Sequence, residues 1–368
     1  MEIVISAGES SGDILGGKLC EELRQLDKNI SLSGIGGQAM RKAGVDTLHD
    51  VSETAVIGIY EVLKHYPRLH KILSNLKRHI QQTQPKLLIL IDYPEFNLKL
   101  AAYAKSLNIK VMFYVSPQIW AWRTGRVKKI KQRVDLMAVL FPFELDFYRK
   151  ENINSCLVRH PLLQEVEKYI PVNSLQMMTV ALAPGSRKSE VKKLFPIMLK
   201  AAVLLHDENP SLRFIVPVAP GFNKSDLIKQ LDNLNIPITF EESDFYSTID
   251  KSDVVMIASG TASLQTALMG KAMVIVYKIS PITYRLFGHM IKVKHISLAN
   301  IILNKRVFTE LLQKEVSPEN LYEEIKMLLD DNQRQDKMNE VQTQLYNMLN
   351  QGCNSKELAE KAMQLAVN

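Results

Sequence analysis

The sequence has little cysteine and tryptophan and no long apolar run. Cys20, Cys156 and Cys353 are odd in number and far apart, so they indicate neither a disulfide framework nor a cysteine-based metal site. No stretch approaches the roughly 18 consecutive apolar residues that a membrane-spanning helix needs. The opening residues, MEIVISAGESSGD, lack the basic flank and the long apolar core of a secretory signal. We therefore expect a protein of a reducing, cytoplasmic compartment.

Two signatures of metal-dependent chemistry are absent as well. The chain has neither an Asp-x-Asp pair for a metal-bound sugar nucleotide nor a His-Glu-x-x-His motif. Gly12-x4-Gly17-Lys18 has the spacing of a phosphate loop, but Leu19 stands where a magnesium-binding Ser or Thr is required. The sequence therefore predicts no metal site, no bound cofactor and no nucleoside triphosphatase.

What the sequence does contain is enough apolar material for a large core. Of its 368 residues 46% are hydrophobic, and this length favours two domains over one. The formal net charge of +7 fits nucleic acid, an anionic membrane surface or phosphorylated substrates equally well. The choice among these partners depends on local motifs.

Short apolar strands alternate with amphipathic helical segments almost throughout the chain. Such alternation is typical of parallel sheets covered by helices on both faces. In the first half we expect strands at Ile3–Ser6, Leu32–Ile35, Leu87–Ile91, Val111–Tyr114, Leu136–Val139 and Cys156–Val158. A second set follows at Val180–Ala183, Phe214–Val218, Ile238–Phe240, Val254–Ile257 and Val274–Tyr277. We predict an α/β protein with two Rossmann-like, doubly wound domains that face a cleft (residues 1–165 and 166–335). C-terminal helices at 336–368 are expected to pack back on the N-terminal domain.

One stretch, Lys86–Leu100, combines a buried strand with a carboxylate at its end. Leu87–Ile91 is an apolar run of strand length, and Asp92 follows at once, before Tyr93-Pro94 ends the extended segment. A carboxylate at the carboxyl end of a parallel strand lies where open α/β sheets bind ligands. Asp92 is therefore either a functional residue or a cap of the helix that follows it.

Glycine-rich turns follow other predicted strands. Gly8–Asp13 joins the first strand to the first helix, where a tight structural turn is the alternative to a ligand site. In the second half, Pro184–Arg187 (PGSR) and Ala258–Ser263 (ASGTAS) occupy equivalent positions. Backbone N–H groups at helix N-termini bind phosphate, and an arginine adds a bidentate donor. Together these two turns predict a diphosphate site at the carboxyl edge of the second sheet, neutralised without magnesium.

Two segments combine apolar or aromatic side chains with basic ones. Thr54–Lys77 has a broad apolar face and several Lys and Arg residues, so it fits either an anionic membrane surface or two core helices flanking Pro67. Trp120 and Trp122 lie beside the basic cluster Arg126–Arg133. Aromatic and basic side chains in such a combination are typical of three kinds of site: one that stacks on nucleic-acid bases, one that binds a phosphorylated sugar, and one that contacts lipid headgroups. The residues alone leave these alternatives open.

Nine motifs, spread over nearly the whole chain, form one ordered set. They are AGESSGDILG (Ala7–Gly16), AVIGIYEVL (Ala55–Leu63), IDYPEFN (Ile91–Asn97), YVSPQIWAWR (Tyr114–Arg123), FPFE (Phe141–Glu144), HPL (His160–Leu162), PGSR (Pro184–Arg187), ASGTAS (Ala258–Ser263) and SLAN (Ser297–Asn300). This set resembles that of the lipid A disaccharide synthases, the membrane-associated glycosyltransferases of lipopolysaccharide assembly. The resemblance implies the two-domain GT-B architecture.

The resemblance also implies a reaction and a set of site residues. UDP-2,3-diacylglucosamine would donate its sugar, with inversion and without a metal, to 2,3-diacylglucosamine 1-phosphate, giving a β(1→6) disaccharide and UDP. Asp92 matches the family's proposed base for the acceptor hydroxyl. The implied donor-binding residues are Gly185, Ser186, Arg187, Ser259, Gly260, Thr261, Ala262, Ser263, Gln265, Asn300 and Glu310. The implied acceptor side comprises Glu9, Ser10, Ser11, Glu95, Trp120 and Arg123. Because both substrates carry acyl chains, peripheral association with the inner membrane through Thr54–Lys77 is also implied.

Three positions depart from the family's pattern, and alternatives remain. Glu95 replaces an Asp, Gln265 stands where a Glu usually meets the ribose hydroxyls, and Arg159 stands where Gly is more usual. A UDP-GlcNAc 2-epimerase or a cell-wall GlcNAc transferase would keep the same folds. Nucleic-acid binding is disfavoured, because the basic cluster beside the tryptophans is short and local. The residues leave the oligomeric state open, a homodimer included.

Overall fold

The chain folds into two compact units, each built around its own parallel sheet. A computed structural model describes residues 1–54, 59–117, 124–169, 178–231, 234, 236–279 and 294–367, with the backbone alone at 59–66 and 124. The first unit comprises Met1–Pro161 and Leu349–Asn368, and the second comprises Leu162–Met348. The α/β class expected from the alternating sequence pattern is confirmed.

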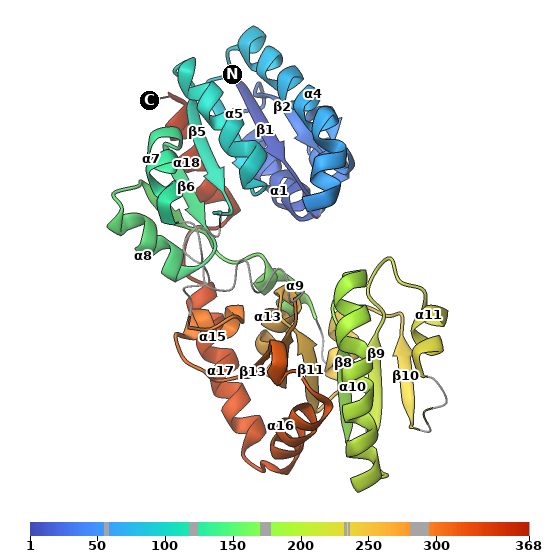
Figure 1. Cartoon of the computed structure of the whole chain (residues 1–368). Coiled ribbons are helices and arrows are strands. Elements are labelled where there is room, and N and C mark those ends of the chain that lie inside the picture. The colour runs from blue at the N-terminus through green and yellow to red at the C-terminus, as the bar shows by residue number, and fades with distance from the viewer. Residues whose placement is uncertain are drawn as a thin grey trace. The chain divides into compact units, whose positions relative to one another are not determined.

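The first unit contains a seven-stranded parallel sheet in the order β3-β2-β1-β4-β5-β6-β7. Figure 1 labels β1, β2, β5 and β6 among these strands. Its strands are β1 (Glu2–Ala7), β2 (Ser31–Gly36), β3 (Asp46–Asp50), β4 (Leu87–Ile91), β5 (Lys110–Tyr114), β6 (Leu136–Val139) and β7 (Ser155–Leu157). Its helices include α1 (Ser10–Leu26), α2 (Gln38–Lys42), α3 (Val51–Thr54), α4 (Ile59–Thr83), α5 (Pro94–Ser106), α7 (Val127–Arg133) and α8 (Pro142–Lys150). Strand addition reverses direction between β1 and β4, which are neighbours, so the topological switch point of the sheet lies there.

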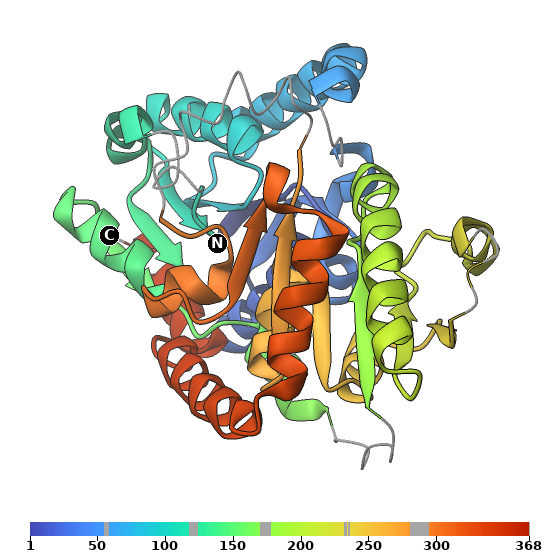
Figure 2. The ribbon, with the colours of Figure 1, turned by 60° about the horizontal axis from the view of Figure 1, so that its bottom comes forward.

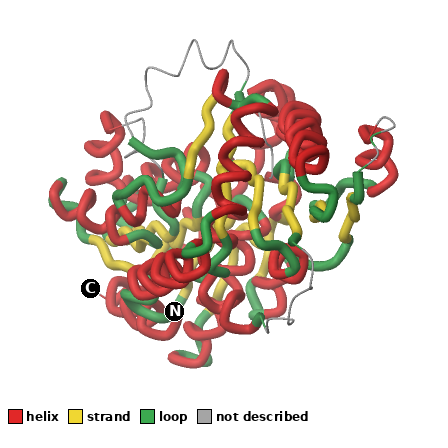
Figure 3. The backbone as a smooth tube through the Cα atoms, turned by 90° about the horizontal axis from the view of Figure 1, so that it is seen from below, coloured by secondary structure: helices red, strands yellow, loops and turns green. Residues whose placement is uncertain are grey.

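The centre of this sheet explains its apolar sequence. All five side chains of β4 are fully buried, and the strand has the bounds expected from the sequence. A central strand with helices on both faces has no solvent side, so its residues do not alternate between apolar and polar. Packing joins α1 with α18 (Ser355–Val367), and α5 with α4 and α7, while helices flank the strands throughout (Figure 3).

The second unit contains a six-stranded sheet in the order β10-β9-β8-β11-β12-β13. Its strands are β8 (Thr179–Ala183), β9 (Arg213–Pro217), β10 (Ile238–Glu241), β11 (Val254–Ala258), β12 (Ala272–Tyr277) and β13 (Thr309–Leu312). Its helices include α9 (Leu162–Lys168), α10 (Lys188–Glu208), α11 (Lys224–Ile228), α12 (Phe245–Asp250), α13 (Thr261–Leu268), α15 (Leu298–Leu303), α16 (Pro318–Asp330) and α17 (Arg334–Leu349). Helices α10 and α16 lie side by side on this sheet (Figure 2). The switch point falls between the neighbours β8 and β11.

The last two helices belong to different units. Helix α17 is part of the second unit, whereas α18 packs on α1 in the first. Between them, Cys353 forms a parallel bridge with Val158. The second domain expected from the sequence ends at residue 335, which lies inside α17. The structure instead assigns nearly all of α17 to the second unit, so that the chain passes to the first unit only after Met348.

Strands β3 and β13 were not expected from the sequence. Both lie at the edge of their sheet, where only one neighbour pairs with the strand. The sequence of β3, Asp-Thr-Leu-His-Asp, is mostly polar because an edge strand keeps solvent contact and needs no continuous apolar run. Strand formation there depends on the neighbour more than on local sequence.

The basic, apolar segment Thr54–Lys77 contributes to α4. Among its described side chains, Ile72, Leu73 and Leu76 are buried in the core of the first unit, and Lys71 is exposed. Core packing therefore accounts for these three apolar side chains, which are unavailable to a lipid surface. The side chains of residues 55–66 lie outside the described part. No described helix is both long enough and apolar enough to cross a membrane.

Candidate active site

The switch point of the first sheet brings the turn after β1 against the turn after β4. A Cβ added at Gly8 would come within 2.2 Å of the Cβ of Tyr93, so only glycine fits there without displacement. Buried Asn97 joins the two strand ends: it accepts a hydrogen bond from Ser6 Oγ (2.8 Å) and donates one to the backbone oxygen of Asp92 (2.7 Å). These contacts fix the turn that carries Asp92.

Asp92 occupies a strained backbone conformation directly after β4. Its φ is 51° and that of Tyr93 is 49°, both in the left-handed region that non-glycine residues seldom adopt. Burial of the carboxyl raises the pKa of Asp92; a hydrogen bond with the Tyr93 backbone opposes this shift, and the negative charge of Glu9 adds to it. The N-cap of α5 is Tyr93, and no side chain caps that helix. Asp92 is therefore not the cap that the local sequence also allowed.

Glu9, Ser10 and Ser11 are exposed at the start of α1, which has no side-chain cap. Among the described residues, no side chain accepts a hydrogen bond from the first N–H groups of this helix. Residues 8–12 also match the Gly-x-Ser-x-Gly spacing of hydrolase nucleophile elbows. Among the described residues, however, no histidine forms a hydrogen bond with Ser10, so a serine–histidine pair is not assembled there.

The remaining residues expected on the acceptor side are partly described. Glu95 is exposed in the first turn of α5, and its Oε1 lies 2.5 Å from Nη1 of Arg126 in an ion pair. A carboxylate at this end of a helix also interacts favourably with the helix dipole. Trp120 and Arg123 lie outside the described residues.

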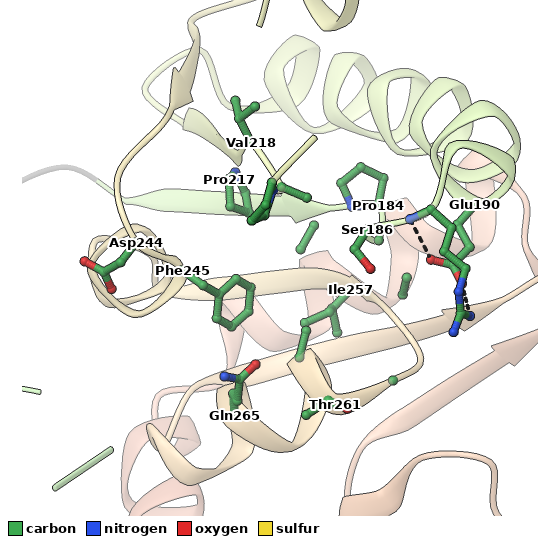
Figure 4. A pocket seen from close by; sticks show the side chains of 18 of the residues that line it. Pro184, Ser186, Glu190, Pro217, Val218, Asp244, Phe245, Ile257, Thr261 and Gln265 are labelled. Carbon is green, nitrogen blue, oxygen red and sulfur yellow. Dashed lines mark hydrogen bonds and ion pairs between the residues drawn. The ribbon is translucent and has the colours of Figure 1, made fainter. Parts of the chain in front are cut away.

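The second sheet has a cavity of about 800 Å³ at the carboxyl ends of its strands (Figure 4). The PGSR turn after β8 and the Ser259-Gly260 turn after β11 line it, on the two sides of the switch point. Pro217–Pro220 at the end of β9 and Glu242–Phe245 after β10 also line it, as do residues of α10 and α13. This is the edge at which doubly wound sheets bind their ligands.

One end of the cavity is suited to phosphate. Gly185 has a φ of 106°, and a Cβ there would lie 2.5 Å from Oε2 of Glu190, so this turn requires glycine. Arg187 donates from Nη1 to Glu190 Oε1 (2.9 Å) and from its backbone N to Oε2 (3.3 Å). The ion pair holds the guanidinium at the start of α10, while 63% of the arginine side chain stays exposed to a ligand.

The opposite end combines an aromatic ring with an amide, since Phe245 and Gln265 lie together there (Figure 4). Gln265 Nε2 donates to the hydroxyl of Tyr246 (2.9 Å), which in turn donates to Glu165 Oε2 (2.8 Å). Burial raises the pKa of Tyr246, so its hydroxyl keeps the proton that it donates. Because the amide nitrogen is engaged, the Gln265 carbonyl oxygen remains to accept a hydrogen bond from a ligand hydroxyl. These hydrogen-bond partners of Gln265 could not be predicted from the sequence.

Three residues expected at the donor site do not line the cavity. Ser263 is buried and donates its hydroxyl to the backbone oxygen of Gly260 (2.7 Å). Asn300 and Glu310 are buried and joined by a hydrogen bond from Nδ2 to Oε1 (2.9 Å). Glu310 also accepts two backbone N–H groups next to the start of α15 (2.9 Å each). Ser263 therefore stabilises the turn at the start of α13. Asn300 and Glu310 stabilise the backbone before α15 and at residues 307–308, which do not line the cavity.

The fold, with two Rossmann-like units, is shared with solved structures. The structure of the kitacinnamycin glycotransferase superposes with a TM-score of 0.64 at 12% identity and covers 99% of both chains. A UDP-GlcNAc 2-epimerase from Neisseria meningitidis gives a TM-score of 0.64 at 13% identity, covering 99% of this chain and 100% of that one. At these identities the similarity establishes the fold alone, which is the GT-B architecture of such glycosyltransferases and epimerases.

Sequence comparison identifies one family among the proteins that share this fold. The family described as Lipid-A-disaccharide synthetase matches residues 3–364. The Lipid-A-disaccharide synthase of Geobacter metallireducens is 43% identical over 337 residues, 89% of this chain and 88% of that protein. That of Nitrosococcus oceani is 39% identical over 344 residues, 91% and 89% of the two chains. The chain belongs to the lipid-A-disaccharide synthase family and is a glycosyltransferase of lipid A synthesis.

Proposed function

We propose that the protein transfers the sugar of UDP-2,3-diacylglucosamine to the O6 hydroxyl of 2,3-diacylglucosamine 1-phosphate, with inversion and without a metal ion. The products are the β(1→6)-linked disaccharide 1-phosphate and UDP. The main support is the cavity of the second unit, which combines phosphate-type turns at one end with Phe245 and Gln265 at the other. That pairing suits a nucleoside diphosphate.

The phosphate end supplies donors where charge develops on the leaving group. Arg187 provides a guanidinium, and the N-terminus of α13 provides backbone N–H groups at Thr261 and Ala262. Apart from its two chain neighbours, no described residue has an atom within 4 Å of the place where a Cβ of Gly260 would be, so a diphosphate has open access to that backbone. As the bond from C1 to the diphosphate breaks, these donors stabilise the negative charge that UDP acquires.

The nucleoside end provides stacking and one directed acceptor. The ring of Phe245 offers a face to a base, and the carbonyl oxygen of Gln265 accepts from a ribose hydroxyl. The hydrogen bonds through Tyr246 to Glu165 keep the amide in that orientation. At this position, Gln265 therefore binds the ribose through one hydrogen bond, without the negative charge that a glutamate would carry.

Asp92 is the proposed general base. Its carboxylate takes the O6 proton while O6 attacks C1 from the side opposite the diphosphate, so one C–O bond forms as the other breaks and the configuration inverts. A raised pKa makes the carboxylate a stronger base than an ordinary aspartate at neutral pH. The fixed turn after β4 supports this role, because it holds the residue in one backbone conformation.

The direct test is an assay with both acylated substrates in detergent and in the presence of EDTA. We expect UDP and the disaccharide in equal amounts, with the β configuration at the new linkage by NMR. Loss of activity on chelation would contradict metal independence, and an α linkage would contradict inversion. Conversion of UDP-GlcNAc without any acceptor would instead support the epimerase alternative.

The pH profile should depend on Glu9. Because the charge of Glu9 contributes to the raised pKa of Asp92, Glu9→Gln is expected to lower that pKa. The base works only when deprotonated, so the acidic limb of kcat/KM should move to lower pH in the variant. Glu21→Gln, an exposed change further along α1, should leave the limb in place. If the acidic limb of the kcat/KM profile stays in place in Glu9→Gln, the charge of Glu9 does not influence the group that titrates.

We also propose that the protein associates peripherally with the inner membrane through the basic side chains of α4. Lys71 is exposed, and each lysine near an anionic lipid surface contributes about 1 kcal/mol of binding. Lys71→Glu reverses one charge and should therefore reduce co-sedimentation with phosphatidylglycerol vesicles by about tenfold. Lys42→Glu, an exposed change on α2, is the control. Unchanged co-sedimentation of Lys71→Glu would exclude this surface.

A further inference from the structure

A second, smaller cavity shares Arg187, Glu190 and Ser259 with the nucleotide cavity. Its volume is about 270 Å³, below the roughly 300–1,000 Å³ of pockets that enclose a drug-sized ligand. Two further lysines line it: Lys193, on the second turn of α10, and Lys278, directly after β12. The cavity therefore suits a small group next to a diphosphate held by Arg187.

The charges that line this cavity are not balanced. Arg187 and Glu190 neutralise each other in their ion pair. Lys193 and Lys278 are half-buried, and neither has a carboxylate within 4.0 Å among the described residues. Lys278 donates a hydrogen bond to the backbone oxygen of Val316 (3.3 Å), and its other two N–H donors have no acceptor among the described residues. Two like charges in a partly enclosed space repel each other unless an anion binds between them.

We propose that this cavity is a phosphate subsite in which Lys193 and Lys278 contact a phosphate of one of the two sugar substrates. The phosphate belongs either to the donor diphosphate, extending from Arg187, or to the 1-phosphate of the acceptor. This identification of the ligand rests on the proposed function. The preference of the cavity for an anion follows from Lys193 and Lys278, which line it without a carboxylate partner among the described residues.

Calorimetric titration with inorganic pyrophosphate tests the subsite independently of turnover. We expect Lys193→Gln and Lys278→Gln each to raise the Kd for pyrophosphate by about tenfold, because each variant loses one charged hydrogen bond to the ligand. Lys192→Gln is the matched control, because Lys192 is exposed, is the neighbour of Lys193 on the same helix and does not line the cavity. Thermal melts of all variants check that folding is retained.

Steady-state kinetics with the acylated substrates identify the phosphate. A higher KM for the UDP-sugar in both lysine variants assigns the cavity to the donor diphosphate, and a higher KM for the acceptor alone assigns it to the 1-phosphate. If neither the pyrophosphate Kd nor either KM differs from that of Lys192→Gln, the subsite is overturned. If the wild type binds pyrophosphate through these lysines but transfers no sugar, the proposed function fails and the phosphate subsite stands.

Discussion

Asp92→Asn is expected to lower kcat by about 10³-fold, within the range that general-base catalysis contributes. An amide has the shape of the carboxylate but cannot take the O6 proton. Asparagine also tolerates the left-handed conformation seen at this position, where φ is 51°, so the turn itself should persist. Release of UDP, followed at saturating concentrations of both substrates, measures the effect.

The matched control is Asp146→Asn, the same chemical change at an exposed position of α8 in the same unit. Its kcat should equal that of the wild type. Circular dichroism and a thermal melt of Asp92→Asn establish that the loss is catalytic. Full turnover by Asp92→Asn would remove this residue as the base, while membership of the family would be unaffected.

The features that could be predicted from the sequence are those encoded over a few adjacent residues. The run Leu87–Ile91 marks a central strand because full burial requires a continuous apolar stretch. The glycines of residues 184–187 and 258–263 mark turns because side chains do not fit there or would block a ligand. In a doubly wound sheet, the turns after the two central strands lie next to each other at the switch point. The positions of the two motifs in the sequence were therefore enough to predict that both turns contribute to one site.

What could not be predicted depends on contacts between distant parts of the chain. Gln265 is oriented by Tyr246 and Glu165, which are 19 and 100 residues away in sequence. Asp13 follows a glycine turn but accepts hydrogen bonds from Gly37 N (2.6 Å) and Ala39 N (2.9 Å) at the start of α2. No local pattern distinguishes a carboxylate that holds a neighbouring loop from one that meets a ligand.

Arg187→Gln is expected to raise the Kd for UDP by roughly 10²-fold, because charged hydrogen bonds to phosphate are lost. Uridine has no phosphate and should bind the variant as it binds the wild type. Lys188→Gln removes an equal charge from the next, exposed residue and should change neither affinity by more than about twofold, since exposed charges are screened. Isothermal titration of the wild type and the two variants with both ligands measures the six dissociation constants.

The ion pair with Glu190 makes a second variant necessary for interpreting this loss. In Arg187→Gln the carboxylate of Glu190 stays beside the cavity without its partner, so part of the loss for UDP arises from repulsion of the phosphates. The double variant Arg187→Gln/Glu190→Gln removes that repulsion and should recover up to about tenfold of the affinity. If direct contact with phosphate were unimportant, the double variant would bind UDP as tightly as the wild type. If Arg187 acted only by shaping the turn, uridine and UDP would weaken together, because both would meet the same altered backbone.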